Sequence, residues 1–254
     1  MDHLLANPLF TTIAIIAVLL SGLSKGGFGG GVGFVGVLAL AQISSPIIAV
    51  ATMLPILCVM DLIGVREYRK DWHSPSLRIL VIGCLLGTVI GTITFKWMDD
   101  QIIRLIVGFI ALSFFVDFIR SGGEKAPARV FSNPIGYILG TLAGFTSFVI
   151  HAGLPPVAMY LLPQRLEKRI HVGTIVILFF IINYAKIIPY WSLGLFTTTN
   201  ITTSLILMPL APLGMYIGIK VNHLISQKWF MRTNYTILCI LGLRLLYDGL
   251  IPFL

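Results

Sequence analysis

The chain has 254 residues, of which 57% are hydrophobic and only 11% carry a charge. Soluble domains carry about 25% charged residues. The 18 basic and 10 acidic side chains are too few to cover a soluble surface, and the mean hydropathy is +0.94. This composition excludes a soluble enzyme domain, a disordered chain and a disulfide scaffold. We expect residues 1–254 to form a single all-α domain embedded in a membrane.

The net charge of +8 is explained by the membrane itself, because membrane proteins concentrate Lys and Arg in cytoplasmic loops. We therefore expect the lipid bilayer, and no nucleic acid, to be a partner of this chain; a homodimer stays open. The three cysteines lie within apolar runs and form no CxxC pair or His/Cys cluster, so no metal site is predicted. The segment GGFGGG lacks the GK[S/T] of a nucleotide-binding loop, and we expect no cofactor.

Eight apolar runs follow one another along the chain. A run of about 20 residues is long enough for one helix across a bilayer core of about 30 Å. Most of the runs have this length, and two are far longer. In chain order they cover residues 8–42, 46–64, 77–95, 102–118, 134–164, 170–190, 197–219 and 235–253.

The two long runs, 8–42 and 134–164, are each broken near the middle. The first break is SKGGFGGG at residues 24–31, and the second is TSFVIHAGLPP at residues 146–156. Glycine and proline at this density end helices. Each run could therefore be one kinked crossing, or a re-entrant hairpin of two half-helices that returns to the side it entered.

The distribution of Lys and Arg favours the hairpins. If both long runs cross the membrane, seven basic residues lie on one side and eight on the other. If both are hairpins, thirteen lie on one side and two on the other. Membrane proteins keep their basic loops in the cytoplasm, so the second arrangement is favoured. It predicts that the basic side is cytoplasmic and that both termini are outside.

The two halves of the chain also resemble each other, which indicates an internal duplication. The predicted repeats are residues 8–120 and 133–253, each with one re-entrant broken-helix hairpin and three transmembrane helices, or about eight segments in total. An odd number of crossings inverts the second copy, and inverted repeats with broken segments are typical of secondary transporters. At an offset of 122 the matching pairs are Gly22 and Gly144, Ser24 and Thr146, Gly31 and Gly153, Thr52 and Thr174, and Asp61 and Asn183.

Two segments resemble a known family. SGLSKGGFGGGVGFVGV begins at Ser21 and AGFTSFVIHAGLPPVAMYLLP begins at Ala143. Together with the repeat, they resemble the sulfite exporter TauE/SafE family of the toluene-sulfonate uptake permease group. The resemblance extends from about Leu9 to Tyr247. It implies a bacterial inner-membrane transporter that exports a small sulfur-containing oxyanion, such as sulfite or an organosulfonate, from the cytoplasm.

The two breaks are the predicted substrate site, and we expect them to meet near the bilayer midplane. Backbone N–H groups of a glycine loop can converge on an anion, a lysine can offset its charge, and hydroxyls can donate to it. The alternatives are helix packing for the glycines, snorkelling to an interface for the lysine, and bonds to freed carbonyls for the hydroxyls and histidine. The candidate residues are Ser24, Lys25, Gly26, Gly27, Gly29, Gly30, Gly31, Thr146, Ser147, His151 and Gly153.

Two further positions are candidates for coupling or gating. Asp61 and Asn183 are equivalent in the repeats; Asp61 could carry a proton, pair with Lys25, or pair near the basic cytoplasmic loop, and the last is favoured. Lys186 lies on nearly the same helix face as Asn183, and we expect it to reach the outer interface past Pro189, although a place on an exit path stays open.

Two other functions are weighed against export. A proton-coupled uptake permease for an organosulfonate or carboxylate could use Asp61 or His151. An intramembrane enzyme is disfavoured, because the chain has no H-E-x-x-H motif and no convincing Ser/His pair, so no catalytic residue is predicted. Export of an anion needs no ATP, since the membrane potential supplies about 2.3 kcal/mol per charge per 100 mV.

Overall fold

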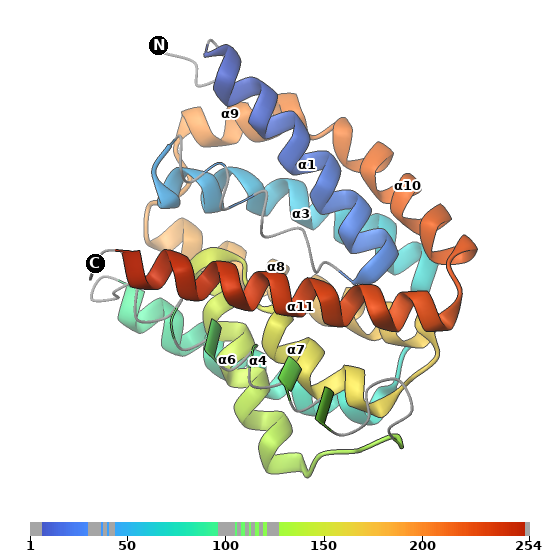
Figure 1. The fold of residues 1–254 in the computed structure, drawn as a ribbon. Coiled ribbons are helices and arrows are strands. Elements are labelled where there is room, and N and C mark those ends of the chain that lie inside the picture. Colours follow the sequence, from blue (N-terminus) through green and yellow to red (C-terminus); the bar gives the residue numbers. More distant parts are fainter. Residues whose placement is uncertain are drawn as a thin grey trace.

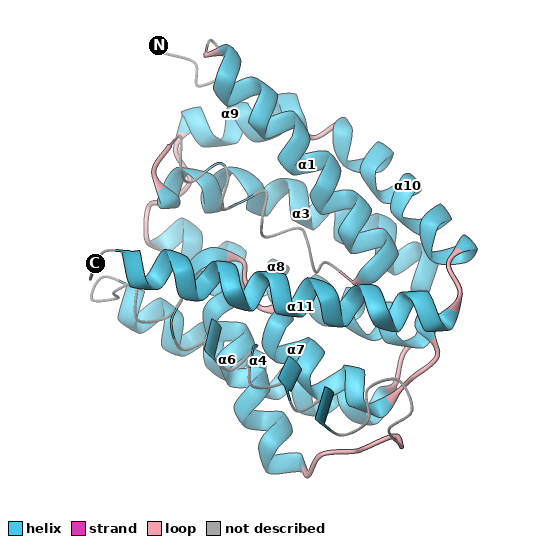
Figure 2. Cartoon of the chain, in the orientation of Figure 1, coloured by secondary structure: helices cyan, strands magenta, loops and turns pink. Residues whose placement is uncertain are grey.

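The computed structural model describes residues 7–29, 44–95 and 127–251, with single positions at 37 and 40 and between 105 and 120. All regular elements in these residues are helices (Figures 1 and 2). The elements are α1 (Pro8–Phe28), α3 (Pro46–Tyr68), α4 (Ser74–Thr94), α6 (Asn133–Ile150), α7 (Leu154–Leu161), η4 (Leu162–Gln164), α8 (Lys168–Ser192), α9 (Thr198–Leu207), α10 (Leu210–Leu224) and α11 (Gln227–Leu250).

Helix starts follow ordinary capping chemistry. Proline is favoured in the first turn of a helix, where its missing N–H costs nothing, and it begins α1 and α3. The side chain of Asn7 accepts a hydrogen bond from the Leu9 N–H at 3.0 Å, and Ser45 accepts one from the Ile48 N–H at 3.2 Å. These caps set the starts of two of the predicted apolar runs.

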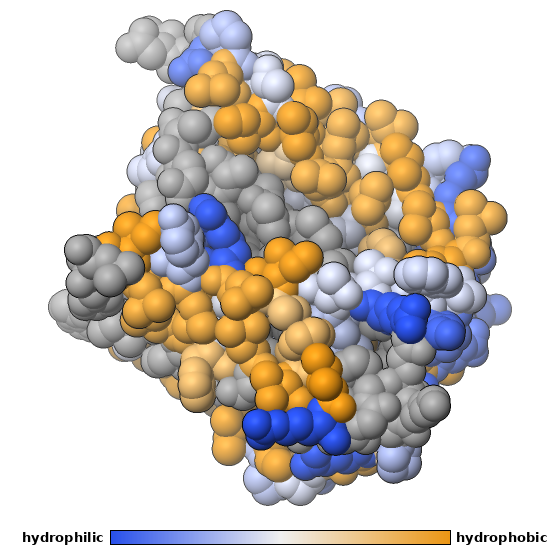
Figure 3. Space-filling view, viewed as in Figure 1, coloured by the Kyte–Doolittle hydropathy of each residue, from blue (hydrophilic) through white to orange (hydrophobic). Residues whose placement is uncertain are grey.

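Five helices are long and apolar enough to cross a membrane: α1, α3 from Ile47 onward, α4, α6 and α8. The pair α9 and α10, bent by 49°, is a sixth candidate in the described residues if it counts as one span. Large apolar side chains such as Ile93 and Leu205 are more than half exposed. Figure 3 shows this apolar surface over α1, α10 and α11. The chain is therefore a multi-pass membrane protein.

Two predicted crossings are not confirmed. α11 covers residues 235–250 of the predicted run 235–253 but is not among the candidate spans. It carries Arg244 and Asp248, which form an ion pair one turn apart at 3.0 Å. The run 102–118 lies mostly outside the described residues. The predicted count of eight segments stays a prediction.

Helices from the two halves of the chain pack against each other. α1 lies along α10, α4 along α6, and α3 against α8. Small residues allow the close approach: a Cβ on Gly22 would lie 2.8 Å from the backbone of Gly214, and a Cβ on Gly83 would lie 2.6 Å from the Tyr137 carbonyl oxygen. Figure 1 shows α1 and α10 side by side. The core of the described residues therefore consists mainly of contacts between the halves.

The second long run folds back on itself at its break. α6 ends at Ile150 and α7 starts four residues later, after the left-handed residue His151. The two arms return to each other, because the Arg129 N–H before α6 donates to the carbonyl of Pro163, after α7, at 2.9 Å. This geometry agrees with a hairpin and not with one straight crossing.

The first break starts later than expected. The segment SKGG at residues 24–27 was predicted to be loop, but α1 continues through it to Phe28 and ends at Gly29. The reason is packing: Gly26 and Gly27 face α10, where a Cβ on Gly26 would lie 2.6 Å from the Met215 carbonyl oxygen. The second arm of this run lies mostly outside the described residues.

Candidate substrate site

The ends of α1 and α6 meet at one cavity, which is partly open. Gly29 caps α1 with φ 80° and His151 caps α6 with φ 55°, so both positions have the left-handed backbone that commonly ends helices. Both residues line a cavity of about 40 Å³. The two breaks are thus close together, as the equivalence of these positions suggests. The lining residues are Ser21, Lys25, Gly29, Val37, Leu57, Ser147, His151, Leu154, Phe179 and Asn183.

Lys25 forms a buried ion pair at this cavity. Its Nζ lies 2.6 Å from Oδ1 of Asp61, and the exposed fractions of the two residues are 5% and 0%. The Nδ2 of Asn183 donates to the other oxygen, Oδ2, at 2.7 Å. Lys25 does not snorkel, and Asp61 pairs in the interior and not near the basic loop. Both alternatives are wrong because α1 and α3 place these residues against each other inside the helix bundle.

The expectation that Lys186 reaches the outer interface is also wrong. Its side chain is completely buried, and its Nζ donates to the carbonyl and hydroxyl oxygens of Ser147, each at 3.1 Å. It also lies 2.9 Å from Nδ1 of His151. Lys186 shares a face of α8 with Asn183, and that face turns toward the end of α6. The helical spacing to Asn183 was the signal in the sequence that could have placed it inside.

The contacts of His151 define its protonation. Its Nε2 lies 3.0 Å from the Val50 carbonyl oxygen, which has no proton to give, so Nε2 carries the hydrogen and donates. In a neutral ring Nδ1 then has a lone pair, which accepts from the Lys186 ammonium. A second ring proton at Nδ1 would point at that ammonium. The ring is therefore neutral in this arrangement.

Other predicted site residues serve the helix ends. The Thr146 hydroxyl lies within hydrogen-bond distance of the carbonyls of Leu142 and Ala152, so it satisfies freed backbone groups. Gly153 lies at the start of α7, where a Cβ would be 2.8 Å from the Ala143 carbonyl oxygen. Ser24 is buried in α1.

The glycines of the first break divide into three groups. Gly26 and Gly27 pack on α10, and their carbonyls accept hydrogen bonds from the Tyr68 hydroxyl at 2.7 Å and from Asn222 at 2.8 Å. Gly29 lines the cavity. Gly30 and Gly31 lie outside the described residues.

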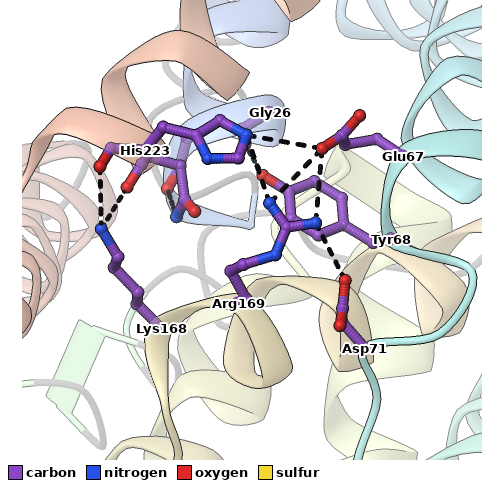
Figure 4. A network of polar contacts seen from close by, with 9 residues as sticks. Gly26, Glu67, Tyr68, Asp71, Lys168, Arg169 and His223 are labelled. Atoms are coloured by element: carbon purple, nitrogen blue, oxygen red, sulfur yellow. Dashed lines mark hydrogen bonds and ion pairs between the residues drawn. The ribbon is translucent and has the colours of Figure 1, made fainter.

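A second polar cluster, which the sequence did not predict, joins α3, α8 and α10 (Figure 4). The Arg169 guanidinium donates to Asp71 at 2.9 Å and to Glu67 at 3.3 Å, and lies 3.2 Å from Nε2 of His223. Lys168 donates to the last carbonyls of α10, including that of Asn222 at 2.6 Å. We call this the Arg169 network. Lys168 and Arg169 lie in the first turn of α8, whereas the sequence predicted them only as charges of a cytoplasmic loop.

The comparisons with known proteins agree with this structure. The family model described as sulfite exporter TauE/SafE matches residues 13–245, nearly the whole chain. The comparisons with curated proteins and with solved structures found no match. The members of this family are membrane transporters and not enzymes. On the family match and the apolar helices together, the chain belongs to the sulfite exporter TauE/SafE family.

Proposed function

We propose that this protein is a secondary transporter that exports a small sulfur-containing oxyanion, sulfite or a small organosulfonate, across a bacterial inner membrane. The observation that carries the proposal is the cavity between the two helix ends, lined by Lys25, Ser147 and His151. Its volume of about 40 Å³ accommodates roughly three water-sized groups. A cavity of this size suits an anion of a few heavy atoms.

The inverted repeat is part of this proposal, and contacts between equivalent residues support it. Asp61 and Asn183, 122 positions apart, are hydrogen-bonded to each other. Tyr68 donates to the carbonyl of Gly26 at 2.7 Å, and at the same offset Tyr190 donates to the carbonyl of Phe148 at 2.5 Å. α1 of the first half packs on α10 of the second half, and α6 of the second half packs on α4 of the first half. The same kind of contact therefore occurs with the two halves exchanged. We propose a two-fold axis in the membrane plane that relates residues 8–120 to residues 133–253.

The proposed orientation places both termini outside and the basic loops in the cytoplasm. Figure 1 supports it, because the N- and C-terminal ends lie at one side of the molecule, away from the α10–α11 connection. The Arg169 network joins helices at the basic end. The negative interior of the cell drives an anion outward through such a transporter.

Export without proton coupling is favoured over proton-coupled uptake by the contacts of the two candidate proton carriers. Asp61 is held by Lys25 at 2.6 Å and by Asn183 at 2.7 Å. His151 presents its acceptor nitrogen to Lys186 at 2.9 Å. A proton added at Nδ1 of His151 would have to displace the Lys186 ammonium, and a proton added to Asp61 would remove the charge that attracts Lys25.

The test is flux in liposomes that contain the purified protein and are loaded with sulfite or methanesulfonate. We expect efflux that grows with an inside-negative potential and does not change when a pH gradient is collapsed. Lys220→Met is a control variant that loses a lysine away from the cavity, because Lys220 lies on the surface over the Tyr216 ring. Its efflux should equal that of the wild type. Uptake that requires an inward proton gradient would establish the symport alternative instead.

A further inference from the structure

The charges around the cavity do not cancel. Lys25 and Asp61 neutralise each other at 2.6 Å. Lys186 is as deeply buried, lies within electrostatic reach of both, and is held only by the neutral groups of Ser147 and His151 among the described residues. With Lys186 in its ammonium form, the formal sum of Lys25, Asp61 and Lys186, the charged groups at the cavity among the described residues, is +1.

A buried ammonium without a counter-ion is costly, because hydrogen bonds to neutral groups replace only part of its hydration. The three acceptors of Lys186 match the three N–H donors of the charged form. Two of those acceptors, the Ser147 hydroxyl and the His151 ring, belong to residues that line the cavity. The excess charge is thus placed directly behind the cavity wall.

We infer that the cavity selects a sulfur oxyanion with a single negative charge, such as a sulfonate or hydrogen sulfite, over a dianion such as sulfate, and that Lys186 supplies the balancing charge. The inference rests on the proposed function and narrows its substrate class. Lys186 acts as a positioning residue, through Ser147 and His151, whereas Lys25 lines the cavity while its charge is already balanced by Asp61.

The experiment compares methanesulfonate with sulfate, two tetrahedral anions of similar size that differ by one charge. Binding to the purified full-length protein is measured by thermal shift and by calorimetry at matched ionic strength. We expect wild-type protein to bind methanesulfonate at least tenfold more tightly than sulfate. Asp61→Asn releases the charge of Lys25 and makes the sum +2, so the preference should move at least tenfold toward sulfate. A purely structural role of Asp61 would lower both affinities and leave their ratio unchanged.

Two further variants test which of the two lysines supplies the balancing charge. Lys25→Met combined with Asp61→Asn keeps the sum at +1 through Lys186, so the preference for methanesulfonate should persist. Lys186→Met makes the sum zero, and binding of both anions should weaken at least tenfold. Lys220→Met, a surface lysine, should change neither affinity. If Lys186→Met does not fold, the ratios in Asp61→Asn and in the double variant still decide.

Three results would overturn the inference: equal or tighter binding of sulfate by the wild type, an unchanged ratio in Asp61→Asn, or loss of the preference in the double variant. If sulfite or methanesulfonate flux persists in these cases, the proposed function stands and only the inferred preference for a single negative charge fails. If the wild type neither binds nor moves any sulfur oxyanion, both fail.

Discussion

The two helix breaks have the same backbone and different charges. Gly29 and His151 hold equivalent left-handed positions. Lys25 in the first break corresponds to Ser147 in the second, and Asp61 corresponds to Asn183. The second break has its lysine on the neighbouring helix instead, at Lys186, where the first half has Gly64. Among the described residues a lysine serves each break, but only the lysine of the first break is paired with a carboxylate, which leaves one positive charge at the site when Lys186 is protonated.

The largest expected effect comes from breaking the charged pair of the first break. Lys25→Met leaves Asp61 buried without its partner, which costs about 3–5 kcal/mol of unfolding free energy. Transport should fall at least tenfold. Adding Asp61→Asn removes the stranded charge and should recover most of the stability. Thermal unfolding in detergent measures the stability of Lys25→Met and of the double variant. If Lys25→Met were as stable as the wild type, the ion pair would not contribute to the stability of the fold.

The next effect concerns the cap of the second break. His151→Gly gives it the residue of the first break and relieves left-handed strain of about 1 kcal/mol. It also removes the ring's hydrogen bond to the Val50 carbonyl, worth about 1 kcal/mol, and leaves one donor of Lys186 without a partner, at about 1–3 kcal/mol. We expect a net loss of about 2 kcal/mol in thermal unfolding. A stabilised variant would contradict the assigned role of the ring.

The proposed repeat predicts a pair of equal effects. Tyr68→Phe and Tyr190→Phe each remove one hydroxyl that donates to a buried helix carbonyl. Each should cost about 1 kcal/mol. Measured side by side under the same conditions, the two unfolding free energies should agree within error. A large difference between the two unfolding free energies would mean that the two contacts share a geometry but contribute differently to stability.

The smallest effect is expected away from the breaks, in the Arg169 network. The side chains of Arg169, Glu67 and Asp71 are about a quarter to a third exposed, so solvent screens their ion pairs. Arg169→Gln should cost no more than about 1 kcal/mol of unfolding free energy. The loss should shrink further in high salt. A loss as large as that of Lys25→Met would show that this end of the molecule carries more of the stability than the cavity does.

Much of the fold follows from the sequence by itself. The apolar runs marked the helices, because a membrane span needs about 20 apolar residues. Glycine and proline placed the second break at residues 146–156, which contain the end of α6, although α6 continues through the first five of these residues to Ile150. In the first break they overstated the loop, because Gly26 and Gly27 serve packing on α10. Local composition shows that the backbone can bend or approach closely, and the neighbouring helix decides which.

The sequence by itself determined a helical membrane protein of the TauE/SafE family, two broken segments, and the lysine and hydroxyls at them. Only the tertiary structure decided that Lys25 pairs with Asp61 and that Lys186 turns inward to Ser147 and His151. The reason is that helical periodicity groups residues on one face of a helix, while the packing of α3 and α8 against α1 and α6 decides where that face points. The charge of the site depends on this packing and cannot be read from either break alone.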